Sequence, residues 1–244
     1  MDGVELGARF SLATNRLNYC GPADAEPRLY RAIVSGTGLA EARGSLERFE
    51  ALLPYLQAIG RRHGLDPFDL RVVEAYWVGN ELLDAFGAPE FREILTALEG
   101  RGLPRSIGRR LRENLPPDAL PFHAFHVAFV GVGAVTGHVP TTLPNMEACR
   151  PAWAKVEEVR DGTLRLRKPV LEVDGGQLRL GAEVEIDLPY DPQVLPEVRP
   201  GASVAVHWGF PALVLSSAQR AAVEGYTLRS LEAANPALAA LGVL

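Results

Sequence analysis

The sequence predicts an α+β protein, with a mainly helical domain in residues 1–147 and a small antiparallel β-barrel plus a C-terminal helix in residues 148–244. Up to about Pro144, apolar residues recur at the spacing of amphipathic helices. After Cys149 the chain changes to short β-prone runs separated by turn signals. Because this change of period occurs once, we place the domain boundary near residues 144–148.

The clearest helix of the first part is predicted over the segment LDPFDLRVVEAYWVGNELLDAFG. Asp66 is expected to cap this helix, with Pro67 at its first position and Asp69 in its first turn, where negative charge is favourable. Gly87 is expected to close it. The apolar stripe consists of Leu70, Val73, Trp77 and Leu83, with Tyr76 beside them.

Three further helices are predicted in the first part. The segment SLERFEALLPYLQAIGRRHG has helical spacing, and Pro54 is expected to kink or break it because proline removes a helix hydrogen bond. The segments APEFREILTALEG and PRSIGRRLRENL predict shorter helices. The apolar segment PDALPFHAFHVAFVGVGAV is ambiguous between a buried helix and a strand.

Five β-prone runs occupy the second part: AWAKVEEV, TLRLR, PVLEV, AEVEIDL and SVAVHWG. The turn signals RDG, DGG and YDP separate them, and their even spacing favours a small antiparallel barrel. Gly209 and Pro211 are expected to end the last run. The final helix is expected to begin with a capping box of Ser216 and Gln219 and to end at Asn235-Pro236.

Composition limits the class of protein. The 244 residues are 47% hydrophobic and 23% charged, which is typical of a soluble globular protein with a sizeable core. The net charge of −5 argues against nucleic acid and against an anionic membrane surface as partners. Two cysteines are too few for a disulfide scaffold, and the first residues lack the apolar stretch of a signal peptide. We therefore expect a cytoplasmic protein.

Some motifs of the first part have functional and structural interpretations. The segment GVGAVTG has the wrong spacing for a dinucleotide-binding loop, so close packing is the favoured reason for its glycines. His123 and His126 would share one face of a helix and are second-tier metal candidates, although a structural or interdomain role is favoured. Cys20, in LNYCGP, is a candidate nucleophile that simple burial explains better.

Cys149 opens the β part and His207 lies on its last predicted strand. A closed barrel would bring the two side chains together although 57 residues separate them. A thiolate and an imidazole suit iron, nickel, copper or zinc, and two protein ligands leave positions open for other groups. Spacing alone does not distinguish such a site from burial of both side chains in the core.

The segments CRPAWAKVEEV and VRPGASVAVHWGFPALVLSSAQRAAVEGYTL carry a resemblance. Cys149 precedes Lys155-Val156, and His207 lies in a Val-His-x-Gly-Phe element, at the spacing found in the HypC/HupF family of nickel–iron hydrogenase maturation chaperones. Residues 148–235 resemble that family, which implies an OB-like barrel with a C-terminal helix. The resemblance also implies that Cys149 and His207 hold an iron fragment with cyanide and carbonyl ligands.

The chain departs from that family in two respects. The family cysteine is N-terminal, whereas 148 residues precede Cys149, and Trp153 replaces a family proline. The helical domain, docked on the barrel, would then take the place of a partner protein that the free-standing chaperones of the family bind. The whole chain also resembles an uncharacterised group of longer proteins associated with hydrogenase gene clusters, through the segments YCGP, EAYW-x-GN, FHV and HW.

The leading hypothesis is a hydrogenase maturation or assembly accessory protein rather than an enzyme. It would bind a hydrogenase subunit precursor and other maturation proteins, and in its fuller form it would carry the iron fragment. A carrier requires Cys149 and His207 to be close together and partly exposed. An exposed apolar patch for a partner is expected at Trp153, Trp208 and Phe210.

Two alternatives remain open. In the first, the same barrel is a metal-free interaction module and the helical domain is an adaptor. In the second, Cys20 and either His123 or His126 form a cysteine-dependent enzyme, which needs the thiolate and the imidazole within about 3–4 Å of each other.

Overall fold

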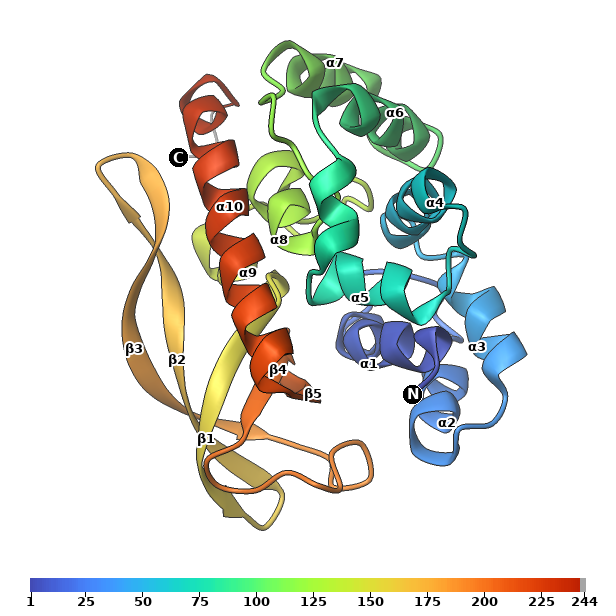
Figure 1. Ribbon diagram of the computed structural model, residues 1–244, viewed down its shortest axis with the longest axis vertical. Coiled ribbons are helices and arrows are strands. Elements are labelled where there is room, and N and C mark those ends of the chain that lie inside the picture. The colour runs from blue at the N-terminus through green and yellow to red at the C-terminus, as the bar shows by residue number, and fades with distance from the viewer. Residues whose placement is uncertain (242–244) are drawn as a thin grey trace.

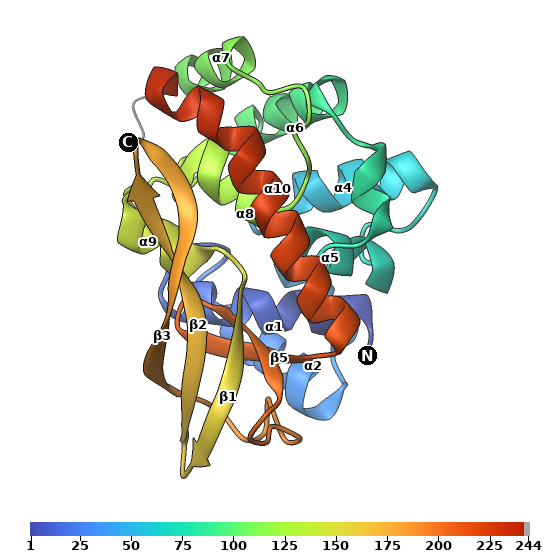
Figure 2. The same ribbon diagram turned by 60° about the vertical axis from the view of Figure 1, so that its left-hand side comes forward.

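The computed structural model describes residues 1–241 and has mixed α and β structure. A twisted antiparallel sheet forms one side of the molecule, and most helices form the other (Figure 1). The long C-terminal helix runs between the sheet and the other helices, as Figure 2 also shows. The described part contains ten α-helices, two short helices of other types and five strands.

The helices precede the sheet, except for the last one. The α-helices are α1 (Gly3–Arg16), α2 (Glu26–Ser35), α3 (Leu39–Leu46), α4 (Leu52–His63), α5 (Leu70–Trp77), α6 (Ala88–Glu99), α7 (Arg105–Glu113), α8 (His123–Phe125), α9 (Leu143–Cys149) and α10 (Ser217–Leu241). A 3-10 helix, η1 (Glu81–Ala85), and a π-helix, η2 (His126–Gly131), complete the set. The strands are β1 (Ala152–Arg160), β2 (Thr163–Asp174), β3 (Gln177–Pro189), β4 (Ser203–His207) and β5 (Phe210–Leu215).

The helix predicted from Asp66 begins later and is shorter than expected. Asp69 is the N-cap of α5, because its side chain accepts a hydrogen bond from the Arg71 backbone N–H at 2.9 Å. The Asp66 side chain accepts instead from the Phe68 N–H, so the prediction that Asp66 caps the helix was wrong. The hydrogen bond from the Phe68 N–H to the Asp66 side chain stabilises a turn that precedes the helix.

A glycine separates α5 from η1. Gly79 has a φ of +94°, and a Cβ at this position would lie 2.3 Å from the ring of Tyr226 on α10. Only glycine fits here without strain, because it tolerates both the positive φ and the close approach. The predicted continuous helix is therefore interrupted where α10 packs against it.

The remaining helix predictions are largely confirmed. The segment around Pro54 is helical from Leu52 onward as α4, and only its first two residues lie in the preceding helix α3, so the break expected at Pro54 does not occur there. Pro54 lies in the first turn of α4, where a missing N–H costs no helix hydrogen bond. The ambiguous segment is helical, with the three-residue α8 continuing into the π-helical η2.

The strands form one antiparallel sheet with the order β3-β2-β1-β4-β5. Two predicted runs merge into β2, with an irregularity in pairing between Pro169 and Leu171. Strand β5 was not predicted, and it accommodates Pro211 because it is an edge strand. Within the described residues no strand pairing joins β5 to β3, so the sheet is open and the predicted barrel is not confirmed.

Helix α10 begins as predicted and ends later. Ser216 and Gln219 form the expected capping box through hydrogen bonds of 3.0 and 3.1 Å. The helix continues through Pro236, so the prediction that it ends there was wrong. The Asn235 side chain bonds both the N–H and the carbonyl of Leu178 on β3, and the last turn is buried at Ala237, Leu238 and Leu241. These contacts compensate for the hydrogen bond that the proline removes.

The helical and β parts share one hydrophobic core. Buried residues from both sides of the predicted boundary belong to a single cluster, among them Phe10, Tyr76 and Phe125 from helices and Ala205 and Leu213 from the sheet. The two parts therefore support each other's packing. Among the described helices, none is long and apolar enough to cross a membrane.

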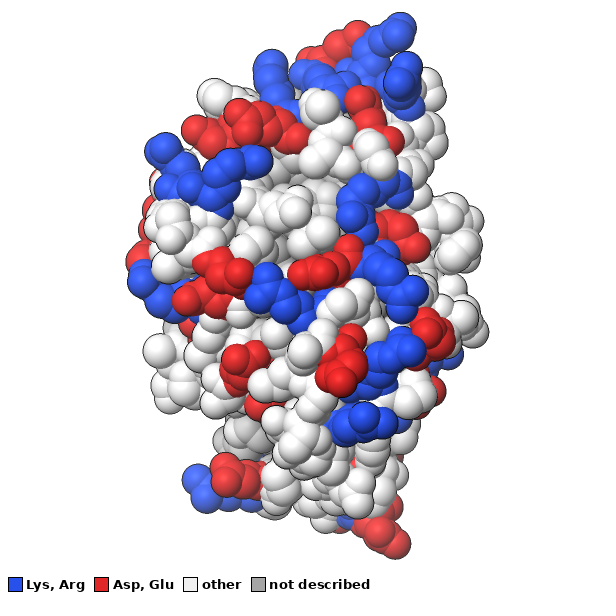
Figure 3. Space-filling view, turned by 90° about the vertical axis from the view of Figure 1, so that its right-hand side faces the viewer, with Lys and Arg blue, Asp and Glu red and all other residues white. Residues whose placement is uncertain are grey.

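The helical face of the molecule carries charges of both signs side by side (Figure 3). Many of them are paired across the surface, as in Arg43 with Asp66, Arg71 with Glu81 and Arg61 with Glu93. On this face the charges form no continuous basic field of the kind that binds nucleic acid.

Candidate metal centre

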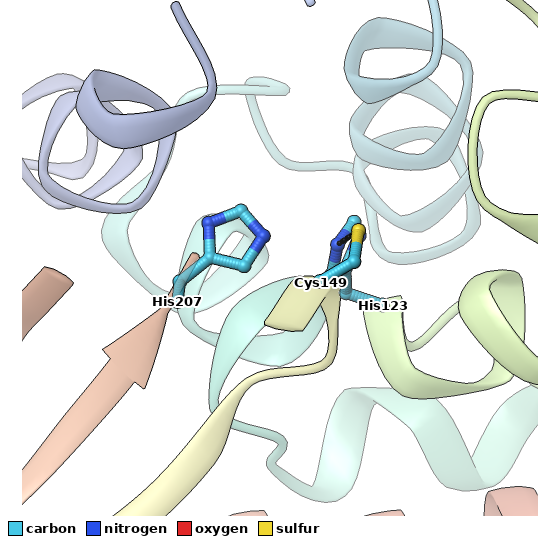
Figure 4. A group of neighbouring side chains, drawn as sticks. All are labelled: His123, Cys149 and His207. Carbon is cyan, nitrogen blue, oxygen red and sulfur yellow. Dashed lines mark hydrogen bonds between the residues drawn. The ribbon is translucent and has the colours of Figure 1, made fainter. Parts of the chain in front are cut away.

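Three side chains from distant parts of the sequence converge at the junction of the helices and the sheet. His123 lies on α8, Cys149 ends α9 and His207 ends β4 (Figure 4). One potential ligand atom from each lies within 4.8 Å of the other two. The side chains are 7%, 7% and 1% exposed, respectively. This His–Cys–His group could hold a metal ion.

One ring nitrogen of His207 carries no proton and faces the other two side chains of the group. Its Nδ1–H donates to the Phe10 carbonyl at 2.7 Å, because a carbonyl oxygen can only accept. Nε2 is therefore unprotonated in the neutral ring, and it faces Cys149 and His123 (Figure 4). This atom is buried and has no hydrogen-bond partner among the described residues. Burial lowers the pKa of His207 to about 4, so the ring is neutral near pH 7.

His123 connects the centre to α5. Its Nδ1 lies 2.7 Å from the Tyr76 hydroxyl, and its Nε2 lies 3.5 Å from the Cys149 Sγ. Burial, together with the neighbouring His207 and His126, holds the pKa of His123 well below its usual value. Metal-bound histidines typically hydrogen-bond through the second ring nitrogen, as both His123 and His207 do here.

The surroundings of Cys149 keep its thiol protonated in the absence of a cation. Burial raises the pKa of Cys149 far above its usual value, while the Trp208 side chain acts in the opposite direction. A bound metal ion reverses this preference, because a coordinated thiol loses its proton. Without a metal ion, Cys149 is therefore a neutral thiol beside neutral imidazoles. With a metal ion bound, it would be a thiolate ligand.

Buried charges fix the end of α9 that carries Cys149. The Arg150 guanidinium is buried, and its Nε donates to Glu147 at 2.8 Å. Glu147 also accepts from the Lys168 ammonium and, at 2.7 Å, from the Leu171 backbone N–H on β2. We call Glu147, Arg150 and Lys168 the ion cluster, and it attaches α9 to the sheet.

A small cavity of about 50 Å³ adjoins the three side chains. It is lined mainly by apolar and aromatic groups, including Tyr76, Trp77 and Trp208, and also by Cys20 and His126. This volume is enough for a few water-sized groups beside a metal ion.

The His–Cys–His group and the cavity lie within a region of the chain that matches one protein family. The family of unknown function DUF6390 matches residues 1–241, nearly the whole chain. The chain belongs to the DUF6390 family. His123, Cys149 and His207 all fall inside the matched region. No curated protein and no solved structure matches this DUF6390 chain.

Cys20 and His126 of this DUF6390 protein line the cavity outside the three-residue group. His126 Nδ1 lies 2.8 Å from the Tyr55 hydroxyl. Burial, and secondarily Glu50, raises the pKa of Cys20 to about 12, which disfavours a reactive thiolate. In the described part of the chain Cys20 makes no side-chain hydrogen bond with a histidine.

The aromatic residues proposed as a partner patch do not form one exposed surface. Trp153 is 5% exposed and belongs to the core. Trp208 is partly buried against Tyr19, with ring centroids 4.7 Å apart, and Phe210 is partly buried near the Arg16 guanidinium. The expected patch was therefore wrong, because Trp153 lies in the core and the other two side chains are partly covered by Tyr19 and Arg16.

The expected exposure of the metal ligands was wrong too. Cys149 and His207 lie together but are buried, because the helical part covers them. His123 was expected to act beside His126, and the two rings do stack with centroids 5.8 Å apart. His123 in addition lies beside Cys149, which the sequence did not predict. The supporting roles of Phe10, Tyr76 and Trp77 had no clear sequence signal beyond the segment EAYW, since they depend on tertiary contacts.

Proposed function

We propose that this DUF6390 protein binds one transition-metal ion through His123, Cys149 and His207. The observation that carries the proposal is the partnerless Nε2 of His207, which is buried and faces the other two side chains. An unsatisfied buried polar atom costs about 1–3 kcal/mol, and a metal ion would satisfy it. One thiolate and two imidazoles suit iron, copper, nickel or zinc, whereas calcium and magnesium prefer oxygen ligands.

We further propose that the ion is iron carrying cyanide and carbonyl ligands, held during the maturation of a hydrogenase. The resemblance of residues 148–235 to the HypC/HupF family supports this identity, since Cys149 and His207 stand at the positions that hold the fragment in that family. The cavity beside the ligands gives small diatomic groups room. Because Cys149 and His207 are buried, the carrier that hands the fragment on, which requires partly exposed ligands, is not part of this proposal: the protein would retain the fragment within a complex.

In this proposal the protein is a cytoplasmic accessory protein with an OB-like fold in its C-terminal part, and its partners are a hydrogenase subunit precursor and other maturation proteins. The burial of Cys149 and His207 also supports a second function, in which the protein is a metal-free adaptor. The two functions differ in one respect: an adaptor would keep its partner when either residue is replaced.

The deciding experiment is an infrared spectrum of the protein purified without oxygen from cells that express a hydrogenase maturation system. Cyanide and carbonyl stretching bands have almost no protein background. We expect such bands in the wild type, iron in the same sample, and loss of both in Cys149→Ala. A hydrogenase subunit that co-purifies with wild type and variant alike, without bands, would favour the adaptor. Neither bands nor partner would contradict both functions.

A hydrogen bond to one ligand gives a finer test. In Tyr76→Phe, His123 loses the hydroxyl that orients its ring, and we expect zinc affinity to fall by about 10–100-fold. The matched control is Tyr55→Phe, which removes an equally buried hydroxyl from His126. Competition with a chromophoric chelator measures both affinities. Equal losses in the two variants would mean that Tyr76 acts through stability and not through the metal.

A further inference from the structure

The cavity beside the metal centre gathers polar atoms that lack partners. In the part of the chain that the structure describes, eight buried side-chain nitrogen or oxygen atoms have no hydrogen-bond partner. Four of them belong to residues that line this one cavity: Ser11 Oγ, Trp77 Nε1, His207 Nε2 and Trp208 Nε1. Buried tryptophan N–H groups usually find an acceptor. The Trp77 indole has none among the described residues, and the Trp208 indole lies close enough to the Cys149 thiol to lower its pKa but completes no hydrogen bond with it, so a further acceptor in this space would satisfy both.

We propose that Trp77 and Trp208 donate hydrogen bonds to a small monoanion that completes the coordination of the metal ion. Ser11 is the third donor of this anion site. The inference rests on the proposed metal site and deepens it, because it specifies the chemical class of the additional ligand and the residues that select it.

Trp77 lies among the residues of the centre. Its ring stacks on Phe10 with centroids 4.9 Å apart and planes 9° from parallel. Its centroid lies 4.4 Å from that of His123 and 5.0 Å from that of His207. The Trp77 indole therefore packs against both histidine rings of the proposed metal site.

Trp208 is held beside Cys149 by an unusual backbone conformation. Its φ of +51° is in the left-handed region, which costs a non-glycine residue about 1 kcal/mol. The Trp208 backbone N–H donates to the Ala148 carbonyl at 2.6 Å, which joins the residue after His207 to the residue before Cys149. Strain of this kind often occurs at functional sites, and Trp208 is one of the residues that line the cavity.

Charge and size define the ligand. A divalent ion with one thiolate and no further ligand carries a net charge of +1 in a buried site, and one small monoanion, cyanide among them, would cancel it. Among the described residues that line the cavity, none is Asp, Glu, Lys or Arg, so no side chain supplies that charge. Indole N–H groups donate only, and therefore select an acceptor. A volume of about 50 Å³ admits about three water-sized groups.

The test uses azide as the probe and zinc as the metal. The chain has three tryptophans, so a nitrogen-15-labelled sample gives three indole N–H signals in an NMR spectrum. On titrating azide into the zinc-loaded protein, we expect the signals of Trp77 and Trp208 to move. The signal of Trp153, which does not line the cavity, should stay in place. Single tryptophan-to-phenylalanine variants assign the signals.

The azide and zinc affinities of single variants provide a second measurement. Its conclusion does not require every variant to fold. We expect Ser11→Ala to weaken azide binding about tenfold with zinc affinity nearly unchanged, and Trp153→Phe to change neither. Trp208→Phe should weaken both, because its side chain also stabilises the Cys149 thiolate. If zinc does not bind the wild type, the proposed metal site fails and this inference fails with it. If zinc binds but azide does not, or binds all variants equally, water alone solvates the indoles and only this inference is overturned.

Discussion

The Cys149→Ala variant is expected to bind zinc more than about 100-fold more weakly than the wild type. Loss of a group that merely orients a metal ligand costs about 10–100-fold, so loss of the thiolate itself costs more. Cys149 is also the only group of the three that neutralises charge on the ion, since both histidines bind in their neutral form. Removing it would leave an uncompensated cation in a buried site.

The chain offers a matched control in Cys20→Ala. Cys20 lines the same cavity but lies outside the three-residue group, and burial raises its pKa to about 12. We therefore expect this variant to keep wild-type zinc affinity. Cobalt gives a second measurement, because thiolate coordination produces a charge-transfer absorption that only Cys149→Ala should lose. Absorption that disappears in Cys20→Ala and survives in Cys149→Ala would refute the assigned ligand set.

The sequence singled out two of the three residues of the proposed metal site through the resemblance. Thiols and imidazoles are scarce in this chain, and the resemblance singled out Cys149 and His207 among them. His123 and His126 appeared equivalent, because both follow from the same spacing. Their roles diverge through tertiary contacts: His123 meets Tyr76 and Cys149, whereas His126 meets Tyr55 on another helix. Spacing along one segment cannot predict such a difference.

The sequence predicted the elements that depend on local apolar patterns. It predicted less well the elements that depend on packing against distant residues. The apolar periods located helices α4 to α7 and α10 and strands β1 to β4, whereas α1, α2, α3 and α9 were not predicted individually. The break at Gly79 depends on the ring of Tyr226, and the continuation of α10 through Pro236 depends on the bonds of Asn235 to β3. Strand β5 escaped prediction because Pro211 argues against a strand in general, but not against an edge strand. In each case the deciding partner is distant in sequence.

The ion cluster yields the largest expected effect on stability. Glu147→Ala should lower the free energy of unfolding by about 3–5 kcal/mol, because removing one partner leaves buried charges without compensation. The Arg150 and Lys168 side chains are 1% and 9% exposed, and burial lowers the pKa of both. With Glu147 gone, the two cations would repel each other next to Cys149. Denaturant unfolding measures the loss.

Two further variants separate buried charge from a general effect of losing a glutamate. Glu185→Ala removes a carboxylate whose pair with Arg167 is exposed, so it should cost no more than about 1 kcal/mol. Adding Lys168→Met to Glu147→Ala should restore part of the lost stability, because one of the two uncompensated cations is then replaced by an apolar side chain. A double variant less stable than Glu147→Ala would show that Lys168 stabilises the protein by packing and not through its charge. The hydrogen bonds that attach the end of α9 to β2 would then be those of Glu147 with the Leu171 N–H and of Arg150 with the Pro169 carbonyl.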